Sequence, residues 1–379
     1  MNASDDRTSL WGMRILVAAA CVALAGLGAG PVWGQRPSTD GHVRELARYL
    51  NGVKIAEPVV CRQLAVYPVL VDDVPLVRGR WLTLDAAISR GLVVVSEKGH
   101  GSVPVVWVEN RSRDEHVFIM TGEVIAGGKQ TRTVRHDVVL APGQKIDLDV
   151  FCVEAHRWAG GLAFSAGSKT MLPQSIQGEL RMGADQARVW AEVARNNSAL
   201  KAENATGSLE AALRAAPVRE KLEDVRRAIV PEIPRGTTGF IFVDRGRALG
   251  AEFFGSEDLA RGLLPKLLDS YAVDFVILRG PDRDRDGPRD NRVAIEFFER
   301  VCRTGSEPAN TPGSGSGIRT RQGGLLGDGV SLDAALVHYG VQLGERIVPR
   351  PKSGPTIIYP MPQQQRSIFP MPQQRSESE

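Results

Sequence analysis

The clearest strand pattern of the chain is framed by two segments, Gly122-Glu123-Val-Ile-Ala-Gly127-Gly128-Lys129-Gln130-Thr-Arg132 and Cys152-Val-Glu154-Ala-His-Arg157-Trp158. From Val134 to Cys152, apolar side chains recur at alternate positions outside the turn, interrupted by His136, as they do on strands with one buried face. These positions are Val134, Val138 and Leu140 before a turn, and Ile146, Leu148, Val150 and Cys152 after it.

The turn at 141–145, Ala-Pro-Gly-Gln-Lys, is expected to join these two strands as a hairpin. Matching their apolar faces places Leu140 opposite Ile146. In this register Arg132 lies opposite Glu154. The sequence therefore predicts a cross-strand Arg132–Glu154 ion pair, which a register slip of two residues would break while keeping the apolar face.

The segments around this hairpin predict an α+β fold, with an antiparallel β-rich N-terminal unit, a helical middle and a smaller α+β C-terminal portion. Short apolar runs rich in β-branched residues precede the hairpin, at 64–71, 91–95, 103–108 and 117–120. Residues 184–206 contain neither Gly nor Pro, and their apolar residues have helical spacing.

Local signals in the C-terminal half mark further elements. Gly246 supplies the turn of a second hairpin, and Ser256 caps the helix that follows. Pro265 is expected to begin a separate helix, and residues 273–278 are expected to form a strand.

Composition sets the expected boundaries. Residues 1–34 carry Arg14 before an uncharged apolar run, which predicts a signal peptide; an uncleaved anchor is the alternative. The remaining expected parts are an N-terminal helix and linker at 35–58, a main domain at 59–348 and a disordered Pro/Gln-rich tail at 349–379. The main domain divides into β-rich 59–160, helical 165–230 and α+β 236–348. We therefore expect an extracytoplasmic protein, either periplasmic or secreted.

Charge and cysteine content narrow the class of protein. The 47 Lys and Arg nearly balance the 44 Asp and Glu, which argues against nucleic acid as a partner. No membrane contact is expected beyond the signal or anchor. Outside residues 1–34 the cysteines are Cys61, Cys152 and Cys302, too few for a disulfide-rich scaffold. One disulfide could form among these three cysteines, and their spacing does not indicate which two would pair.

The central block carries the candidate chemistry. A carboxylate on a core-facing strand must be paired or shift its pKa. Glu154 is therefore either half of a buried ion pair that fixes register, or an acid/base or anchor on a pocket floor where arginines recognise an anion. The candidate ligand-binding residues are Glu123, Lys129, Gln130, Arg132, Glu154, Arg157 and Trp158.

Four other motifs have a simpler structural interpretation. Cys152 is a candidate nucleophile, but its place on the apolar face favours a buried thiol. Residues 127–129 predict a tight turn, because the fuller phosphate-loop spacing is absent. Asp282 to Gly287 resembles the start of a calcium loop, yet Val293 stands where its last carboxylate ligand belongs. His338 is expected to be structural. No metal and no cofactor are expected.

The same residues resemble a bacterial and archaeal family, the ARG and rhodanese-phosphatase-superfamily-associated protein domain. The resemblance covers residues 60–345 and rests on Tyr67-Pro68, Glu109-Asn110, Gly122-Glu123, Gly127 to Arg132, Cys152 to Trp158, Ser270-Tyr271-Ala272 and His338. It implies no particular reaction. The family's name implies phosphorylated or nucleotide-like ligands, which a signal peptide argues against.

Three functions follow as expectations. The first is a secreted, non-catalytic domain that binds an unknown anionic small molecule or a protein, with the tail as a second contact. The alternative is a hydrolase- or transferase-like enzyme that uses Glu154 on an anionic, phosphorylated or nucleotide-like small molecule. A third possibility is that the block only nucleates the sheet.

Overall fold

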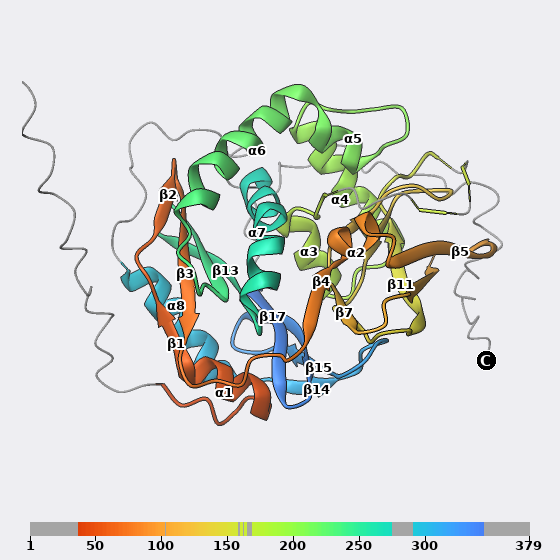
Figure 1. The fold of residues 1–379 in the computed structure, drawn as a ribbon. Coiled ribbons are helices and arrows are strands. Elements are labelled where there is room, and N and C mark those ends of the chain that lie inside the picture. The colour runs from red at the N-terminus through yellow and green to blue at the C-terminus, as the bar shows by residue number, and fades with distance from the viewer. Residues whose placement is uncertain are drawn as a thin grey trace, which may run out of the picture. The chain divides into compact units, whose positions relative to one another are not determined.

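A computed structural model describes residues 37–102, 104–157, 160–161, 163–164, 169–274 and 291–344 (Figure 1). The expected signal segment, Trp158, the Asp/Arg-rich segment at 282–287 and the tail at 349–379 lie outside the described residues. The fold is α+β, as the sequence predicts. None of the helices in the described ranges combines the length and apolarity that a membrane crossing needs.

The largest sheet contains nine strands and joins both ends of the described chain. Its order is β1 (Val53–Ile55), β3 (Leu64–Val71), β12 (Gly239–Asp244), β13 (Arg247–Phe254), β17 (Ala335–Leu343), β16 (Leu325–Leu332), β15 (Ser316–Thr320) and β14 (Glu307–Ala309), with β2 (Val59–Cys61) paired to β3. All of its pairings are antiparallel.

Helices cover both faces of this sheet. On one face, Phe242 of β12 stacks on Tyr271 of α7 (Glu257–Ala272), with ring centroids 3.8 Å apart. On the other face, Phe253 of β13 touches the rings of Tyr49 in α1 (Arg44–Gly52) and Phe298 in α8 (Arg292–Thr304). These aromatic contacts are buried, so they anchor the helices to the sheet.

Two smaller sheets share a second core. One has the order β10 (Val138–Leu140), β7 (Glu115–Ile119), β4 (Arg80–Thr83), and β4 runs parallel to β7, an exception to the antiparallel pattern. The other has the order β5 (Val93–Ser102), β6 (Val105–Asn110), β11 (Lys145–Cys152), β9 (Arg132–Val134), β8 (Val124–Ile125). Short helix α2 (Leu84–Ser89) packs its Leu84 and Ala87 into this core.

The helical middle consists of α3 (Gln174–Arg181), α4 (Gln186–Ala199), α5 (Leu209–Arg214) and α6 (Ala216–Ile229), closed by the 3-10 turn η1 (Val230–Glu232). Trp190 and Val193 of α4 are buried, as their helical spacing predicts. Pro217 stands in the first turn of α6, where it has no hydrogen bond to break.

Local cap and turn signals are confirmed. The Ser256 side chain accepts a hydrogen bond from the Leu259 N–H at the start of α7. Arg245 and Gly246 both have positive φ, as a two-residue hairpin turn between β12 and β13 requires.

Two local predictions are wrong. Pro265 lies inside α7 instead of starting a new helix. The apolar residues on either side of it are buried, and this burial offsets the cost of about 3 kcal/mol that proline imposes in a helix interior. Val273 and Asp274 continue the helical backbone in a π-helical turn where a strand was expected, and the rest of that segment lies outside the described residues.

Candidate functional site

The strand register of the central block differs from the prediction by two residues. Cys152 of β11 lies opposite Arg132 of β9. Strand β10 pairs with β7 instead of β11. The Asn110 side chain donates to the carbonyls of Leu140 and Ala141, which holds the end of β10 next to the β6–β7 connection. The turn at 141–145 therefore joins two different sheets, and the predicted Arg132–Glu154 pair does not form.

Glu154 is instead enclosed by other donors. Its Oε2 accepts hydrogen bonds from Thr131 N at 3.1 Å, Thr131 Oγ1 at 2.9 Å and Arg157 Nε at 2.8 Å. Arg157 Nη1 also donates to the Gly128 carbonyl at 3.0 Å. Burial alone would raise the pKa of Glu154, but these donors bring it below its ordinary value. Glu154 is thus a charged, internally paired carboxylate.

Arg132 lies fully buried next to this group. Its Nη1 donates to Gln130 Oε1 at 3.1 Å, and its Nη2 lies 3.6 Å from Glu97 Oε1. Gln130 Nε2 in turn donates to the Glu154 carbonyl at 3.0 Å. The Lys129 backbone N–H donates to Glu97 Oε1 at 2.9 Å. The structure therefore brings together most of the predicted ligand-binding residues, but they bind one another.

Glu123 belongs to a different buried group. Its Oε1 lies 2.5 Å from Lys266 Nζ of α7, and Lys266 also pairs with Asp85 of α2 at 2.6 Å. Burial alone would lower the pKa of Lys266, but Glu123 and Asp85 raise it, so the ammonium stays charged. This bridge ties α7 to the second core.

Cys152 is a buried thiol. Its Sγ donates to the Glu154 carbonyl at 3.1 Å. The Gln186 side chain accepts a hydrogen bond from the Cys152 backbone N–H and donates one to the Cys152 carbonyl. Burial raises the pKa of the Cys152 thiol, which disfavours the thiolate that a nucleophile needs. Cys61 and Cys302 are also free thiols.

A hollow of about 200 Å³ borders the block at Ala155 and His156. Trp190 and Val193 of α4 line it, together with Asn197 and Asn204. None of the ligand-binding residues predicted from the sequence lines this hollow.

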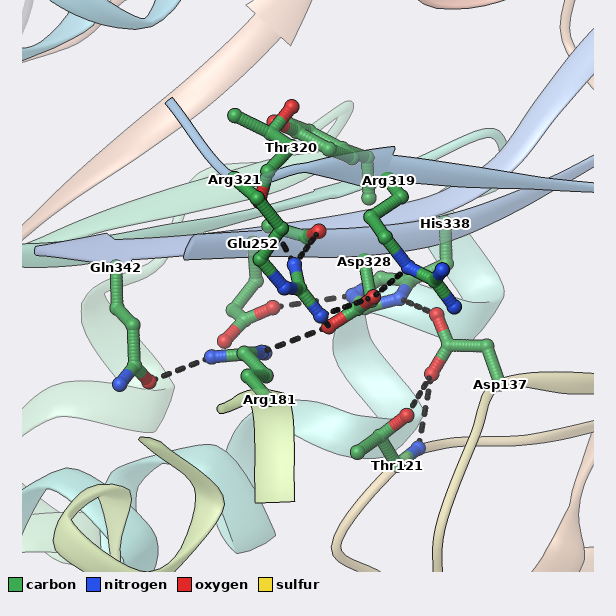
Figure 2. Close-up of polar contacts among 12 residues, drawn as sticks. Thr121, Asp137, Arg181, Glu252, Arg319, Thr320, Arg321, Asp328, His338 and Gln342 are labelled. Atoms are coloured by element: carbon green, nitrogen blue, oxygen red, sulfur yellow. Dashed lines mark hydrogen bonds and ion pairs between the residues drawn. The ribbon is translucent and has the colours of Figure 1, made fainter. Parts of the chain in front are cut away.

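A second polar network lies between the nine-stranded sheet and the segment that precedes β10 (Figure 2). His338 of β17 is fully buried; its Nδ1 lies 2.6 Å from Asp137 Oδ2 and its Nε2 lies 3.1 Å from Glu252 Oε2. Burial alone would lower the pKa of His338, but Asp137 and Glu252 raise it to about 9. Thr121 donates to Asp137 from its backbone N and its hydroxyl. His338 therefore carries a charge that links distant parts of the chain, which agrees with the structural role expected for it.

The outer end of this network is rich in arginine. Three guanidinium groups face Asp328 of β16: Arg321 Nη2 at 2.9 Å from both carboxylate oxygens, and Arg181 Nε and Arg319 Nε each at 3.8 Å from one of them. Arg181 Nη1 donates to Gln342 Oε1 at 2.6 Å. Figure 2 shows these side chains reaching Asp328 from different elements.

A pocket with a volume of about 430 Å³ lies elsewhere. Its walls come from α1, the segment before β4, strands β4 and β7, and the turn between β16 and β17. The lining residues are Arg48, Pro75, Leu76, Val77, Arg78, Trp81, His116, Leu332, Asp333, Ala334 and Ala335.

The aromatic side chains of this pocket are held by a ring stack and a hydrogen bond. The Trp81 indole stacks on the His116 ring, with centroids 4.9 Å apart, and its N–H donates to the Arg78 carbonyl at 2.9 Å. Burial lowers the pKa of His116, with Asp333 opposing, so the imidazole is neutral near pH 7. Leu76 is 42% exposed and adds an apolar rim.

The charged groups that line the pocket are the guanidinium groups of Arg48 and Arg78 and the carboxylate of Asp333, which leaves an excess of one positive charge. Arg48 is half-buried and Arg78 is exposed, and neither forms an ion pair with a carboxylate of the described residues. Asp333 and Ala334 form the two-residue turn at the rim, both with positive φ. A type I′ turn requires positive φ at both of its central residues, and this conformation is sterically unfavourable for Ala334 because it has a Cβ atom.

Sequence reasoning did not identify these pocket residues. The run Val77-Arg-Gly-Arg-Trp81, with basic and aromatic residues together, was the available signal. Arg48 and the turn at 333–334 carry no motif, because the chain brings them to Trp81 only through the tertiary fold. Within the described ranges no three His, Cys, Asp or Glu side chains gather in a way that could hold a metal ion.

Comparison with known proteins gives one positive result. The model of the family described as ARG and Rhodanese-Phosphatase-superfamily-associated Protein domain matches residues 52–341. No curated protein and no solved structure matches the chain.

Proposed function

The chain belongs to the ARG and Rhodanese-Phosphatase-superfamily-associated Protein domain family, and we propose that it is a non-catalytic binding domain for an anionic ligand with a planar apolar group. The ligand would occupy the pocket lined by Arg48, Arg78 and Trp81. This position replaces the pocket that the sequence places at the central block.

One observation carries the proposal: two arginines without carboxylate partners flank an aromatic pocket of about 430 Å³. Small-molecule sites have volumes of about 300–1,000 Å³ and combine apolar walls with a few placed polar groups. Guanidinium groups bind carboxylate and phosphate through paired hydrogen bonds and stack on planar rings. Trp81 and Leu76 supply the apolar surface that a ring would cover.

The central block supports the enzyme alternative less well. A general acid must hold a proton near neutral pH, whereas the pKa of Glu154 is lowered by its contacts with Arg157 and Thr131. A general base must reach a substrate proton, and those same donors engage Oε2 of Glu154. We therefore assign Glu154 a structural role.

We further propose that the protein works outside the cytoplasm. Support for this location comes from the sequence alone, where Arg14 precedes the uncharged run at 15–29. Determination of the N-terminal residue of the protein purified from its native cells tests the proposal. A start at or near Gln35 would support it, and an intact segment in a cytoplasmic fraction would contradict it.

A thermal-shift screen tests the binding function. Purified protein is mixed with aryl phosphates, aromatic carboxylates and their uncharged analogues, and a binder raises the melting temperature by an amount that grows with the logarithm of its concentration relative to Kd. Arg48→Ala should weaken binding of the hits about 10-fold or more, since a charge-assisted hydrogen bond contributes about 1.5–3 kcal/mol. Arg44→Ala is the matched control, because Arg44 is an exposed residue of the same helix and does not line the pocket. Equal losses in both variants, or no hit among the anions, would contradict the proposal.

A further inference from the structure

We propose that Arg181, Arg319 and Arg321 form a second, separate site for a small tetrahedral oxyanion such as phosphate or sulfate, and that Asp328 occupies this site when no anion is bound. The proposal does not depend on the aromatic pocket, which is lined by none of these residues.

The three arginines converge from different elements. Arg181 ends α3, Arg319 belongs to β15, and Arg321 directly follows β15 (Figure 2). In the sheet register Arg319 lies directly opposite Asp328. Arg319 and Arg321 thus come from the end of one strand and Arg181 from a helix, and the fold brings all three guanidinium groups to Asp328 before any ligand arrives.

The Asp328 carboxylate does not satisfy all the hydrogen-bond donors of the three arginines. Only Arg321 reaches its carboxylate at hydrogen-bond distance, at 2.9 Å. Arg181 Nε and Arg319 Nε remain 3.8 Å away. The Arg181 side chain is only 2% exposed, and its Nε makes no hydrogen bond within the described residues. A buried donor without a partner costs about 1–3 kcal/mol, which an anion with four oxygens could recover.

The sheet leaves space for the Arg181 guanidinium. Gly340 of β17 is the other cross-strand neighbour of Asp328. A Cβ at Gly340 would lie 2.9 Å from Arg181 Nη2 and 2.2 Å from Glu252 Oε2. A side chain at this position would therefore push the guanidinium away from the site.

Charge and access both favour an anion at the outer end. Three guanidinium groups face one carboxylate, which leaves an excess of two positive charges there. Behind them, protonated His338 balances one of the two carboxylates of Asp137 and Glu252, so one negative charge remains to oppose the anion. Arg319 is 40% exposed and Asp328 is 17% exposed, so the site opens to solvent at this end.

Isothermal titration of the full chain with inorganic phosphate and with sulfate, at constant ionic strength, tests this proposal. Asp328→Asn removes the competing carboxylate and should tighten phosphate binding at least 10-fold over wild type. Arg319→Ala should weaken binding at least 10-fold in either background. Glu299→Gln is the matched control, because it removes a partly exposed carboxylate paired with Arg303 elsewhere and should leave phosphate affinity unchanged. A phosphate monoester, run in parallel, tells whether the site takes a free anion or an esterified one.

Two results would overturn the proposal. The first is phosphate affinity in Asp328→Asn no higher than in wild type. The second is an Arg319→Ala variant that binds as well as its parent. If Asp328→Asn does not fold, the comparison of wild type with Arg319→Ala decides the question, because Arg319 is 40% exposed and its replacement should change stability little. Affinity for pocket ligands should be the same in all these variants, so failure of this site is distinguishable from failure of the pocket.

Discussion

The buried charge on His338 makes stability depend on pH, and Asp137→Asn is the perturbation that exposes this. In the folded protein the pKa of His338 is raised from 6.5 to about 9. Burial of the ring acts to lower this pKa, but the carboxylates of Asp137 and Glu252 raise it by more. A raised histidine pKa stabilises the fold below the unfolded value of 6.5, and this stability is lost as pH rises through about 9. This rise in the pKa of His338 from 6.5 to about 9 corresponds to about 3 kcal/mol.

Denaturant unfolding at pH 6 and pH 9.5 measures this contribution. We expect the wild-type free energy of unfolding to fall by about 3 kcal/mol between the two pH values. Asp137→Asn keeps the size of the side chain but removes the closest charge, so its loss over the same interval should be smaller by about half or more. NMR titration of the His338 ring checks the premise directly. The reasoning fails if the wild type is equally stable at both pH values, or if the variant loses as much as the wild type.

Three further predictions concern other buried groups. Lys266→Ala should destabilise the protein by about 3–5 kcal/mol, measured by urea unfolding, because it leaves the buried carboxylate of Glu123 and the partly buried carboxylate of Asp85 without their cation; a loss below 1 kcal/mol would contradict this. Glu154→Gln should lower the melting temperature and leave ligand affinity unchanged, and weaker ligand binding in titration calorimetry with an unchanged melting temperature would instead place the ligand site at the central block. Ala334→Gly should stabilise the type I′ turn by about 0.5–1 kcal/mol in the same unfolding assay, and a destabilised variant would show that the turn is not strained.

Features determined by adjacent residues could be predicted from the sequence. Ser256 caps α7 because its side chain accepts from an N–H three residues later, and the Arg245–Gly246 turn needs only its own backbone conformation. The α+β class followed in the same way from hydrophobic periodicity.

Long-range pairing could not be predicted from these signals. The hairpin prediction assumed that strands adjacent in sequence pair, whereas β10 and β11 belong to different sheets. Strand β3 similarly pairs with β12, far along the chain. Pro265 is a third case, since its helical position depends on burial by the rest of the fold.

The contacts of the buried His338 network could not be predicted for the same reason. Asp137, Glu252 and His338 have no spacing that a motif could describe, and they meet only because β13 and β17 pair while the segment before β10 packs onto them. The central block does hold interacting polar residues, but Glu154 pairs with Thr131 and Arg157 and not with Arg132 as predicted. The amino-acid sequence does not tell whether these polar residues bind a ligand or one another. Only the geometry shows that their donors and acceptors satisfy one another.

The most direct test of the central claim is a two-dimensional NMR titration that follows the indole N–H signals of the tryptophans while an anionic aromatic ligand from the screen is added. The proposed function predicts that the Trp81 signal, assigned through Trp81→Phe, shifts in a saturable way and that the shift is weakened in Arg48→Ala. The signal of Trp190, which is buried in α4 beside the smaller hollow, should stay in place. Saturable binding that leaves Trp81 unchanged, or that moves Trp190 instead, would contradict the assignment of the pocket.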